Sequence, residues 1–462
     1  MNIKLKHIYL CLSYSFLALS FIALTYVLIN LSQGNHFDFK SRTWKQNGMF
    51  IFSSKPAGAS IYINDKLSKY RTGSTMIMRK LDIFSPGEYD IKVTKDGYIS
   101  WNKKLVSEAG LVTWANYIWL IKKDIGIKEL TSGQKITRVF PSHDSKKIIL
   151  ETINSGGSSF YVYEVDSNRQ IQIIGKEKIP LGTKVNNFIW SNNDNKIIVD
   201  AMVSGTKKYF ILSGKDFADV SNLTDLFNLD FSSLTWSANS EDEIFCLKND
   251  SLHRINLSER SITAAIVDKV LVFNIVPKDK NKILYIRKDP KTLETALWQT
   301  DVSGNNKLII IEGLSPEEAY GIYAYGNLEK VALISKKSKN ITVMDMNDKS
   351  KELDLSKEAT FAEWSENGKR LLYGNNRSVW SYDFDKKKEY KVFEGDIISA
   401  LWYPDNAHVV IQSRNDNILI EFDGANRTNL ASSPISRLIF TGDHKTFYYI
   451  DDNGNLIQLD VS

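Results

Sequence analysis

Few residues in this 462-residue chain are of the types that form disulfides or metal sites. It has two cysteines: Cys11 lies in an apolar stretch, and Cys246 lies in a strand-like segment far along the chain. A structural disulfide between them is therefore not expected. The six histidines are dispersed, without the closely spaced pairs that bind zinc. The sequence thus predicts no metal site and no cofactor.

Motifs of several enzyme classes are also missing. There is no Gly-x-Ser-x-Gly elbow, no Walker loop and no Gly-x-Gly-x-x-Gly fingerprint. The formal net charge of +5 is small for this length and does not indicate a nucleic-acid partner. We therefore expect a protein that is not an enzyme and does not bind nucleic acid.

One stretch near the N-terminus has no charged residue. It covers residues 8–31, which at 1.5 Å per residue would span roughly 36 Å as a helix, enough to cross a bilayer. A cleaved signal peptide is the competing interpretation, although its apolar part is usually shorter. Basic residues flank the stretch on both sides, so charge alone does not orient it. The short tail at 1–7, ahead of a large folded part, favours a single-pass protein of the cell membrane, cytoplasmic at its N-terminus and extracytoplasmic for the rest.

Eight similar segments fill the last three-quarters of the chain. Each has a strand that ends in a large apolar residue, a polar turn, a β-rich strand, a second turn and another strand. The spacing of about 40–50 residues is typical of the four-stranded blades of a β-propeller. The marker residues that end the first strands are Phe140, Trp190, Trp236, Val276, Tyr325, Trp364, Trp402 and Phe440.

The two ends of this repeat region complement each other. The last segment lacks a fourth strand, and a strand-like segment at 125–131 precedes the first one. Pairing of 125–131 with 455–461 would close the ring and leave no exposed sheet edge. The sequence thus predicts a mainly all-β chain with an eight-bladed propeller over 123–462, with seven blades as the alternative because two segments are weakly marked.

Between the apolar stretch and the repeats, a polar linker is expected over 32–47, followed by short strands over 48–122. Ser54-Lys55-Pro56-Ala57-Gly58-Ala59, Ser85-Pro86-Gly87 and Lys95-Asp96-Gly97-Tyr98 occur there in order. These three turns resemble the PEGA domain, although that family has Glu where this chain has Ala57. The resemblance implies a small β-sandwich of the kind associated with bacterial envelope and surface proteins, without shared catalytic residues.

The repeats themselves resemble TolB-type and WD40-like propellers. Trp190-Ser191, Trp236-Ser237 and Trp364-Ser365 stand where that family has its Trp-Ser-Pro-Asp-Gly turn, and residues 402–405 (Trp-Tyr-Pro-Asp) do the same. The resemblance implies a fold and not an activity, because propellers include binding modules and enzymes. The equivalent place of these tryptophans favours packing between blades over ligand stacking.

Basic residues recur in the loops that would join the second and third strands of the blades. Such loops emerge on one face, so these residues would form a basic rim able to attract an anionic polymer of the cell surface or an acidic envelope protein. The alternative is that lysine and arginine simply occupy turns. The predicted rim consists of Lys207, Lys208, Arg287, Lys288, Lys336, Arg377 and Arg414.

We therefore expect a membrane-anchored binding or assembly scaffold outside the cytoplasm. The alternative is an envelope enzyme that cleaves or cyclises glycans over the central channel. It would need convergent carboxylates, such as Asp230, Glu394 and Asp396, with one pKa raised. An exposed apolar patch on the PEGA-like part would instead favour assembly into a larger complex.

Overall fold

The computed structural model of this chain is mainly β-structure. It describes residues 3–32, 35–38, 42–74, 79–154, 157–174, 179, 183–228, 230–276, 279–289, 292, 294–346, 352–432, 434–440 and 446–461. The chain divides into two compact units. The first comprises Met1–Asp124 with Ser462, and the second comprises Ile125–Val461.

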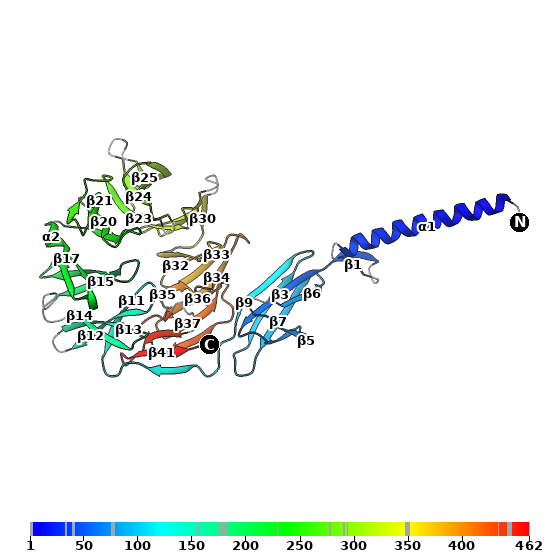
Figure 1. Ribbon diagram of the computed structural model, residues 1–462, viewed down its shortest axis with the longest axis horizontal. Helices are drawn as coiled ribbons and strands as arrows, with labels where there is room; N and C mark the ends of the chain where they lie inside the picture. The colour runs from blue at the N-terminus through cyan, green and yellow to red at the C-terminus, as the bar shows by residue number, and fades with distance from the viewer. Residues whose placement is uncertain are drawn as a thin grey trace. The chain divides into compact units, whose positions relative to one another are not determined.

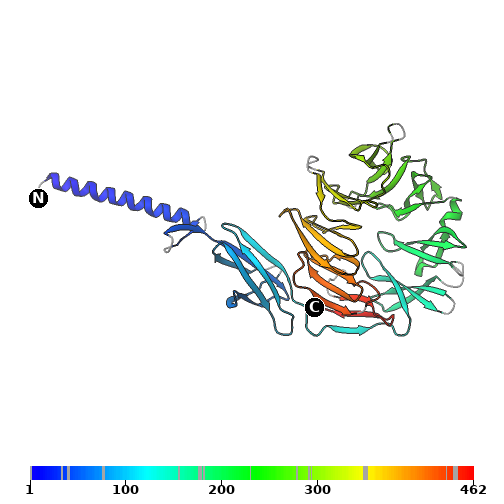
Figure 2. The same cartoon turned by 180° about the vertical axis from the view of Figure 1, so that it is seen from behind.

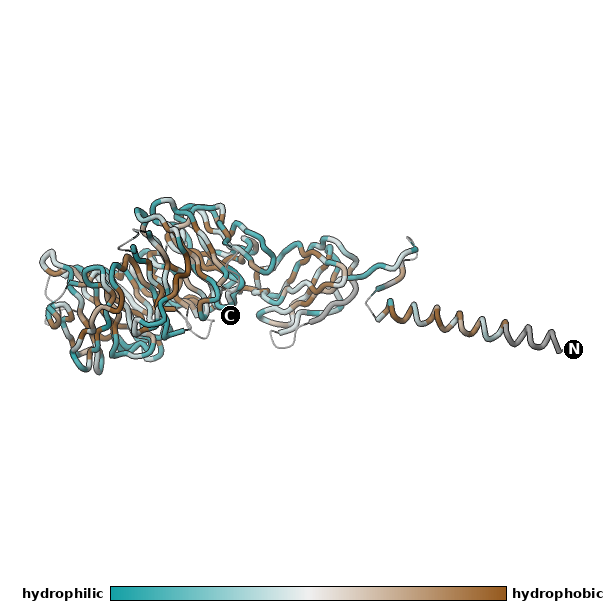
Figure 3. Tube along the Cα trace, turned by 90° about the horizontal axis from the view of Figure 1, so that it is seen from above, coloured by the Kyte–Doolittle hydropathy of each residue, from teal (hydrophilic) through white to brown (hydrophobic). Residues whose placement is uncertain are grey.

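The helix α1 (Ile3–Ser32) contains the uncharged stretch and also takes in residues 3–7. Its segment Leu12–Ser32 has a mean hydropathy of 2.0 and is long and apolar enough to cross a membrane. A signal sequence near an N-terminus has the same properties. Large apolar side chains such as Phe16 and Phe21 are exposed all along this segment, which Figure 3 shows mostly in brown. The surface of the helix is therefore suited to lipid.

The region predicted as an unpatterned linker contains a short hairpin. Strands β1 (Asn35–Asp38) and β2 (Thr43–Gln46) pair antiparallel. Phe37 lies opposite Trp44, and their ring centroids are 5.5 Å apart. Such cross-strand aromatic pairs stabilise two-stranded ribbons. The polar composition of the segment hid this pairing from the sequence prediction.

Two sheets form the β-rich part of the first unit (Figure 1). Their inner faces enclose a core that includes Phe50, Phe52, Ile61, Ile91 and Trp101, each at most 2% exposed. One sheet has the order β5 (Lys66–Arg71), β4 (Ser60–Ile63), β7 (Gly87–Thr94), β8 (Trp101–Ser107), and the other has the order β6 (Arg79–Phe84), β3 (Gly48–Lys55), β9 (Val112–Trp119).

The second unit consists of antiparallel sheets, and within the described residues there are eight of them, each with four strands. Seven are built from consecutive strands. The first four of these are β11 (Ile136–Pro141), β12 (Lys147–Asn154), β13 (Gly157–Glu164), β14 (Arg169–Ile174); β15 (Lys184–Trp190), β16 (Ile197–Val203), β17 (Thr206–Ser213), β18 (Asp219–Asn222); β19 (Ser233–Trp236), β20 (Glu243–Lys248), β21 (Ser251–Asn256), β22 (Ser261–Ile262); and β23 (Val270–Ile275), β24 (Lys282–Lys288), β25 (Thr295–Asp301), β26 (Leu308–Leu314). The next three are β27 (Tyr320–Tyr325), β28 (Lys330–Ser335), β29 (Ile341–Asp345), β30 (Glu352–Leu355); β31 (Phe361–Trp364), β32 (Arg370–Gly374), β33 (Ser378–Asp383), β34 (Lys388–Glu394); and β35 (Ile397–Trp402), β36 (His408–Ser413), β37 (Asp416–Glu421), β38 (Thr428–Ser432). Short helices η1 (Lys215–Phe217) and α2 (Leu223–Phe227) flank β18.

The remaining sheet combines both ends of the second unit. Its order is β10 (Gly126–Glu129), β41 (Leu456–Asp460), β40 (Thr446–Ile450), β39 (Ile439–Phe440). Gly126 lies opposite Asp460 and Glu129 opposite Ile457 in an antiparallel register. The N-terminal strand thus covers what would otherwise be the exposed edge of β41. This is the pairing that the missing fourth strand of the last repeat led us to expect.

Each sheet is joined to the next by packed side chains. Apolar clusters join the sheets from β11–β14 through β31–β34 in sequence order. Arg370 stacks over Phe422 in the following sheet, and Tyr403 packs against Phe440 and Phe447 in the last one. Another cluster joins the last sheet to the first through residues such as Ile148 and Ile450, both fully buried. Figures 1 and 2 show these two sheets side by side.

The marker residues end the first strands of their sheets or lie within a residue of those ends. Four of them are tryptophans whose indole N–H donates to a first-strand carbonyl of the preceding sheet. This hydrogen bond satisfies a backbone carbonyl at the inner edge of that sheet. The four bonds are Trp190 to Phe140 (3.2 Å), Trp236 to Ile189 (2.9 Å), Trp364 to Tyr323 (2.9 Å) and Trp402 to Glu363 (3.0 Å).

Candidate functional site

The seven predicted rim residues all lie at connections between second and third strands. Lys207 and Lys208 begin β17, and Arg287 and Lys288 end β24. Lys336, Arg377 and Arg414 follow β28, β32 and β36. They are distributed over five sheets, with one or two residues in each sheet.

Acidic neighbours offset part of the charge of this rim. Lys207 lies 3.3 Å from Asp200, Lys208 lies 2.9 Å from Asp225, and Arg414 lies 3.6 Å from Asp396. The guanidinium of Arg287 stacks over Trp298, 5.4 Å from the ring centroid. The rim is therefore less positive than a count of basic residues implied. Its role in binding stays a prediction.

The three carboxylates proposed for a catalytic site lie in or beside the connections between consecutive sheets. Glu394 forms an ion pair of 2.6 Å with Lys391, and this partner lowers its pKa. Asp396 pairs with Arg414, and Asp230 is exposed in the segment before β19. A general acid needs a raised pKa, so Glu394 does not fit that role. No group of three or more possible metal ligands occurs in the part of the chain that the structure describes.

A cavity of about 420 Å³ lies where four first strands end. Its walls come from β11, β15, β35 and β39, together with the turn after β11 and the segment before β39. These ends face the turns between first and second strands, so the cavity and the predicted rim lie at opposite ends of the second strands. The lining residues are Pro141, Ser142, His143, Ser145, Asn187, Phe188, Ile189, Trp190, Leu401, Arg437, Leu438, Ile439 and Phe440.

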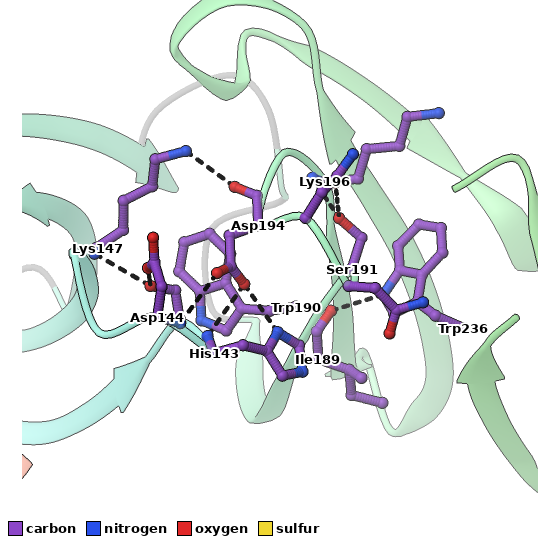
Figure 4. A network of polar contacts seen from close by, with 12 residues as sticks. His143, Asp144, Lys147, Ile189, Trp190, Ser191, Asp194, Lys196 and Trp236 are labelled. Carbon is purple, nitrogen blue, oxygen red and sulfur yellow. Dashed lines mark hydrogen bonds and ion pairs between the residues drawn. The ribbon is translucent and has the colours of Figure 1, made fainter. Parts of the chain in front are cut away.

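The turn after β11 places His143 in the cavity wall. Ser142 Oγ accepts a hydrogen bond from the backbone N–H of Lys147 at 3.1 Å and donates to Asp144 Oδ1 at 2.8 Å. Such serine and aspartate bonds fix a tight turn locally. The turn therefore projects His143 away from its own sheet and towards the next, as Figure 4 shows.

His143 is held by Asp194 of the neighbouring sheet (Figure 4). Its Nδ1 lies 2.8 Å from Asp194 Oδ1, which also accepts the backbone N–H of His143 at 3.0 Å. The hydrogen bond to Asp194 raises the pKa of His143 above 6.5. Burial alone would raise the pKa of Asp194, but the hydrogen bonds from His143 and from the Asp144 backbone lower it overall. The imidazole thus remains cationic to a higher pH than usual, beside an ionised partner.

Arg437 supplies the second ionisable group of the wall. Solvent reaches its side chain inside the cavity, while the surrounding protein lowers its pKa by desolvation and Glu363 partly restores it. Among the described residues, no carboxylate lies within the 4.0 Å of an ion pair with its guanidinium, and no protein acceptor receives its N–H groups. Arg437 is therefore a solvent-exposed cation of the cavity wall whose donors are available to a ligand.

Glu363 of β31 does not line the cavity, but its charge interacts with that of Arg437. Its Oε2 accepts the backbone N–H of Trp402 at 3.0 Å, which satisfies a donor at the inner edge of β35. Burial raises the pKa of Glu363 to about 7, and the Trp402 bond and the charge of Arg437 oppose that rise in part. Near neutral pH this carboxyl is therefore only partly ionised.

Neither Glu363 nor Arg437 was identified from the sequence. Glu363 carried a signal, because it is the only carboxylate at the position before the marker residue. The other segments have Val139, Ile189, Thr235, Ile275, Ala324, Leu401 and Ile439 there. Arg437 carried none, since it lies in an irregular segment before β39.

The first unit has an exposed apolar area of its own. Trp114 of β9 is 49% exposed, and Val112 is 39% exposed. In the parallel register of β9 and β3, they lie opposite Ile51 and Met49, on the face away from Phe50 and Phe52. Leu111 continues the patch beyond the strand. This is the kind of patch that the assembly hypothesis required on the PEGA-like part.

Comparison with solved structures finds remote matches. An oligogalacturonate lyase from Vibrio parahaemolyticus has 12% identity and a TM-score of 0.43, over 73% of this chain and 97% of that one. An oligogalacturonate lyase in complex with manganese has 12% identity and a TM-score of 0.44, over 71% and 98%. A eukaryotic initiation factor has 10% identity and a TM-score of 0.44, over 65% and 89%.

In sequence, no curated protein matches the chain. A family match is found for part of the first unit, and it covers β3 to β9 almost entirely. It includes the three turns that suggested the family. Residues 48–118 match the PEGA domain.

Proposed function

We propose that this chain is a single-pass protein of the cell membrane, with a cytoplasmic N-terminus and its β-rich parts outside the cytoplasm. The length and hydropathy of Leu12–Ser32 support a membrane span. The PEGA match at residues 48–118 supports the outside position, because that family is associated with envelope and surface proteins.

The second unit is, in this proposal, a closed eight-bladed propeller of the TolB or WD40-like kind. Eight four-stranded sheets support the blade number. The pairing of β10 with β41 and the cluster around Ile148 and Ile450 support closure between the last blade and the first. Deleting β10 should then destabilise the first and last sheets together, which hydrogen exchange of the full chain would detect.

The propeller acts as a binding module, and the cavity is its working site. The observation that carries this proposal is an open cavity of about 420 Å³ lined by residues of four sheets. Its volume lies within the range of small-molecule and end-group sites in proteins. The ligand comes from the envelope, as a small molecule, an anionic polymer or a protein side chain, and the basic rim is the competing binding surface.

The test uses the full chain in lipid nanodiscs and a panel of envelope glycans and anionic polymers. Leu401→Trp fills the cavity, and the pair Arg377→Ala and Arg414→Ala removes charge from the rim. Saturable binding that is lost on Leu401→Trp and kept in the rim variant supports the cavity. Loss of binding in the rim variant alone would indicate that the rim is the binding surface. Circular dichroism of each variant checks that it is folded.

An envelope enzyme is the second candidate, and Glu363 favours it. A carboxyl whose pKa burial raises to about 7 can act as a general acid near neutral pH, but Glu363 does not line the cavity, so a substrate would have to reach it from outside that lining. A glycan-cleaving or cyclising activity would then disappear in Glu363→Gln. Product analysis of the same glycan panel tests this. Turnover that survives the substitution excludes Glu363 as the acid.

Assembly into a larger envelope complex is compatible with the binding role. The patch formed by Leu111, Val112 and Trp114 favours it, since exposed apolar groups of this kind mark interaction surfaces. Trp114→Glu should then separate a co-purifying envelope protein from the chain without changing binding at the cavity. Unchanged co-purification would exclude this patch from the interface.

A further inference from the structure

We propose that the cavity binds an organic anion, an apolar body that carries one carboxylate or phosphate group, held by the guanidinium of Arg437. This inference rests on the proposed binding function and specifies its ligand. The charge of the wall, the unused donors of Arg437 and the apolar remainder of the lining support it.

The ionisable groups of the wall are both basic. Among the thirteen lining residues, His143 and Arg437 are the ionisable ones, and there is no carboxylate. His143 already has Asp194 as a partner at 2.8 Å. The net positive charge of the wall therefore belongs to Arg437, and it favours an anion over a metal ion or an ammonium group.

The donors of Arg437 are free for a ligand. In the part of the chain that the structure describes, its guanidinium has neither an ion-pair partner within 4.0 Å nor a hydrogen-bond acceptor. Arg437 is exposed to solvent in the cavity, so a ligand exchanges water for its own acceptors there. A planar carboxylate or a phosphate oxygen pair matches its fork of N–H groups in charge and in geometry.

The remaining wall selects an apolar body. Eight of the thirteen lining residues are apolar, and Leu401, Ile189 and Phe440 among them are accessible to solvent. A free inorganic anion would leave these surfaces in contact with water, whereas an aliphatic or aromatic group would cover them. A chain of sugars would place hydroxyl groups against them without partners. The lining thus fits an amphipathic acid better than a polysaccharide.

Glu363 sets the strength of this site. It does not line the cavity, and its ionised form offsets the guanidinium charge. The groups that act on it are the Trp402 backbone N–H and Arg437, while Asp144 and Asp194 act on His143 and do not line the cavity. Neutralising Glu363 by substitution should therefore strengthen anion binding, and removing Arg437 should weaken it.

The experiment is calorimetry of the full chain in lipid nanodiscs, with empty nanodiscs as a blank. Phenylacetate and phenyl phosphate are the probes, phenylacetamide is the neutral analogue, and inorganic phosphate tests the anion alone. We expect saturable binding of one or both organic anions, with phenylacetamide at least about 10-fold weaker, the difference typical of a charge-assisted hydrogen bond. A preference for phenyl phosphate over phenylacetate identifies a phosphate ester as the ligand group, and the reverse identifies a carboxylate.

Variants separate a specific site from a general charge effect. Arg437→Gln should weaken binding of the preferred anion about 10- to 100-fold, and Glu363→Gln should strengthen it at about pH 8, where the carboxylate is ionised. Arg260→Gln makes the same charge change in the exposed turn between β21 and β22, outside the lining, and should have no effect.

Three results would overturn the inference. Equal affinity for phenylacetate and phenylacetamide would show an apolar site that ignores charge and would leave the binding function intact. Equal loss in Arg437→Gln and Arg260→Gln would show nonspecific attraction. Absence of saturable binding by all four probes would refute the anion site, while glycan or polymer binding that Leu401→Trp abolishes would still support the proposed function.

Discussion

Glu363→Gln should remove part of the pH dependence of the free energy of unfolding. Burial raises the pKa of Glu363 from 4.5 to about 7. The folded protein therefore keeps this proton up to about pH 7, whereas the unfolded chain releases it near its ordinary value. At about 1.36 kcal/mol for each unit of pH between the two values, the difference is worth about 3 kcal/mol at most.

The sign follows from proton binding. Between the two pKa values the folded state holds more protons than the unfolded state, so stability falls as the pH rises. The contribution of Glu363 is fully present below the unfolded value of 4.5 and is lost as the pH rises through about 7. Gln does not ionise. From about pH 4 to about pH 8 the variant should therefore gain up to about 3 kcal/mol relative to the native chain.

Urea unfolding of the full chain and the variant in a mild detergent, followed by circular dichroism at several pH values, measures this difference. The matched control is Glu394→Gln. Glu394 is exposed, and its pKa is lowered by Lys391, so its small contribution is lost as the pH falls instead. A difference between Glu363→Gln and the native chain that stays constant with pH would refute the reasoning. It would mean that Glu363 titrates as an ordinary exposed carboxyl does.

Two further outcomes test the packing between sheets. Trp236→Phe removes the indole N–H that donates to the Ile189 carbonyl at 2.9 Å, and should lower the free energy of unfolding by about 2 kcal/mol or more. The control Trp114→Phe, at an exposed site, should lower it by less than about 0.5 kcal/mol. Equal losses in urea unfolding would contradict the role of Trp236 between sheets. Burial raises the pKa of the Cys246 thiol to about 12. In a Cys11→Ser background, Cys246 should react with an aromatic disulfide reagent only after unfolding, and rapid labelling of the native chain would show that its strand opens.

Local patterns predicted much of the β-structure. The marker residues end the first strands because a large side chain there packs between sheets, and the turn residues after it follow a common plan. The missing fourth strand of the last repeat pointed to β10 and its pairing with β41. These features depend on residues close in sequence or on a simple count of strands, so the sequence contained them.

The charges of the rim were overestimated for a reason that was also local. Asp200 and Lys207 lie on the two arms of one hairpin, β16 and β17, where cross-strand neighbours interact. Asp225 reaches Lys208 from the short helix α2 that follows the same sheet. Counting loop lysines without their hairpin partners left these offsets out. Knowledge of the strand register in each hairpin would have identified these acidic partners.

The cavity could not be predicted because it depends on distant convergence. His143 and Arg437 belong to opposite ends of the repeat region, and only the neighbouring positions of the first and last sheets bring them to one wall. No spacing rule connects residues so far apart. The partial exception is Glu363, whose place before a marker residue is otherwise occupied by apolar side chains and one threonine.

The combination of Glu363 and Arg437 gives a physical reason to look for function at the cavity. Glu363 accepts the Trp402 N–H, but a glutamine could accept that hydrogen bond without any cost of ionisation. What the carboxylate adds is a charge that interacts with Arg437 and that is only partly present near neutral pH. For stability alone that charge is a disadvantage above about pH 7. The charge of Glu363 can instead change the affinity of Arg437 for an anion. Glutamine at this position could not do so.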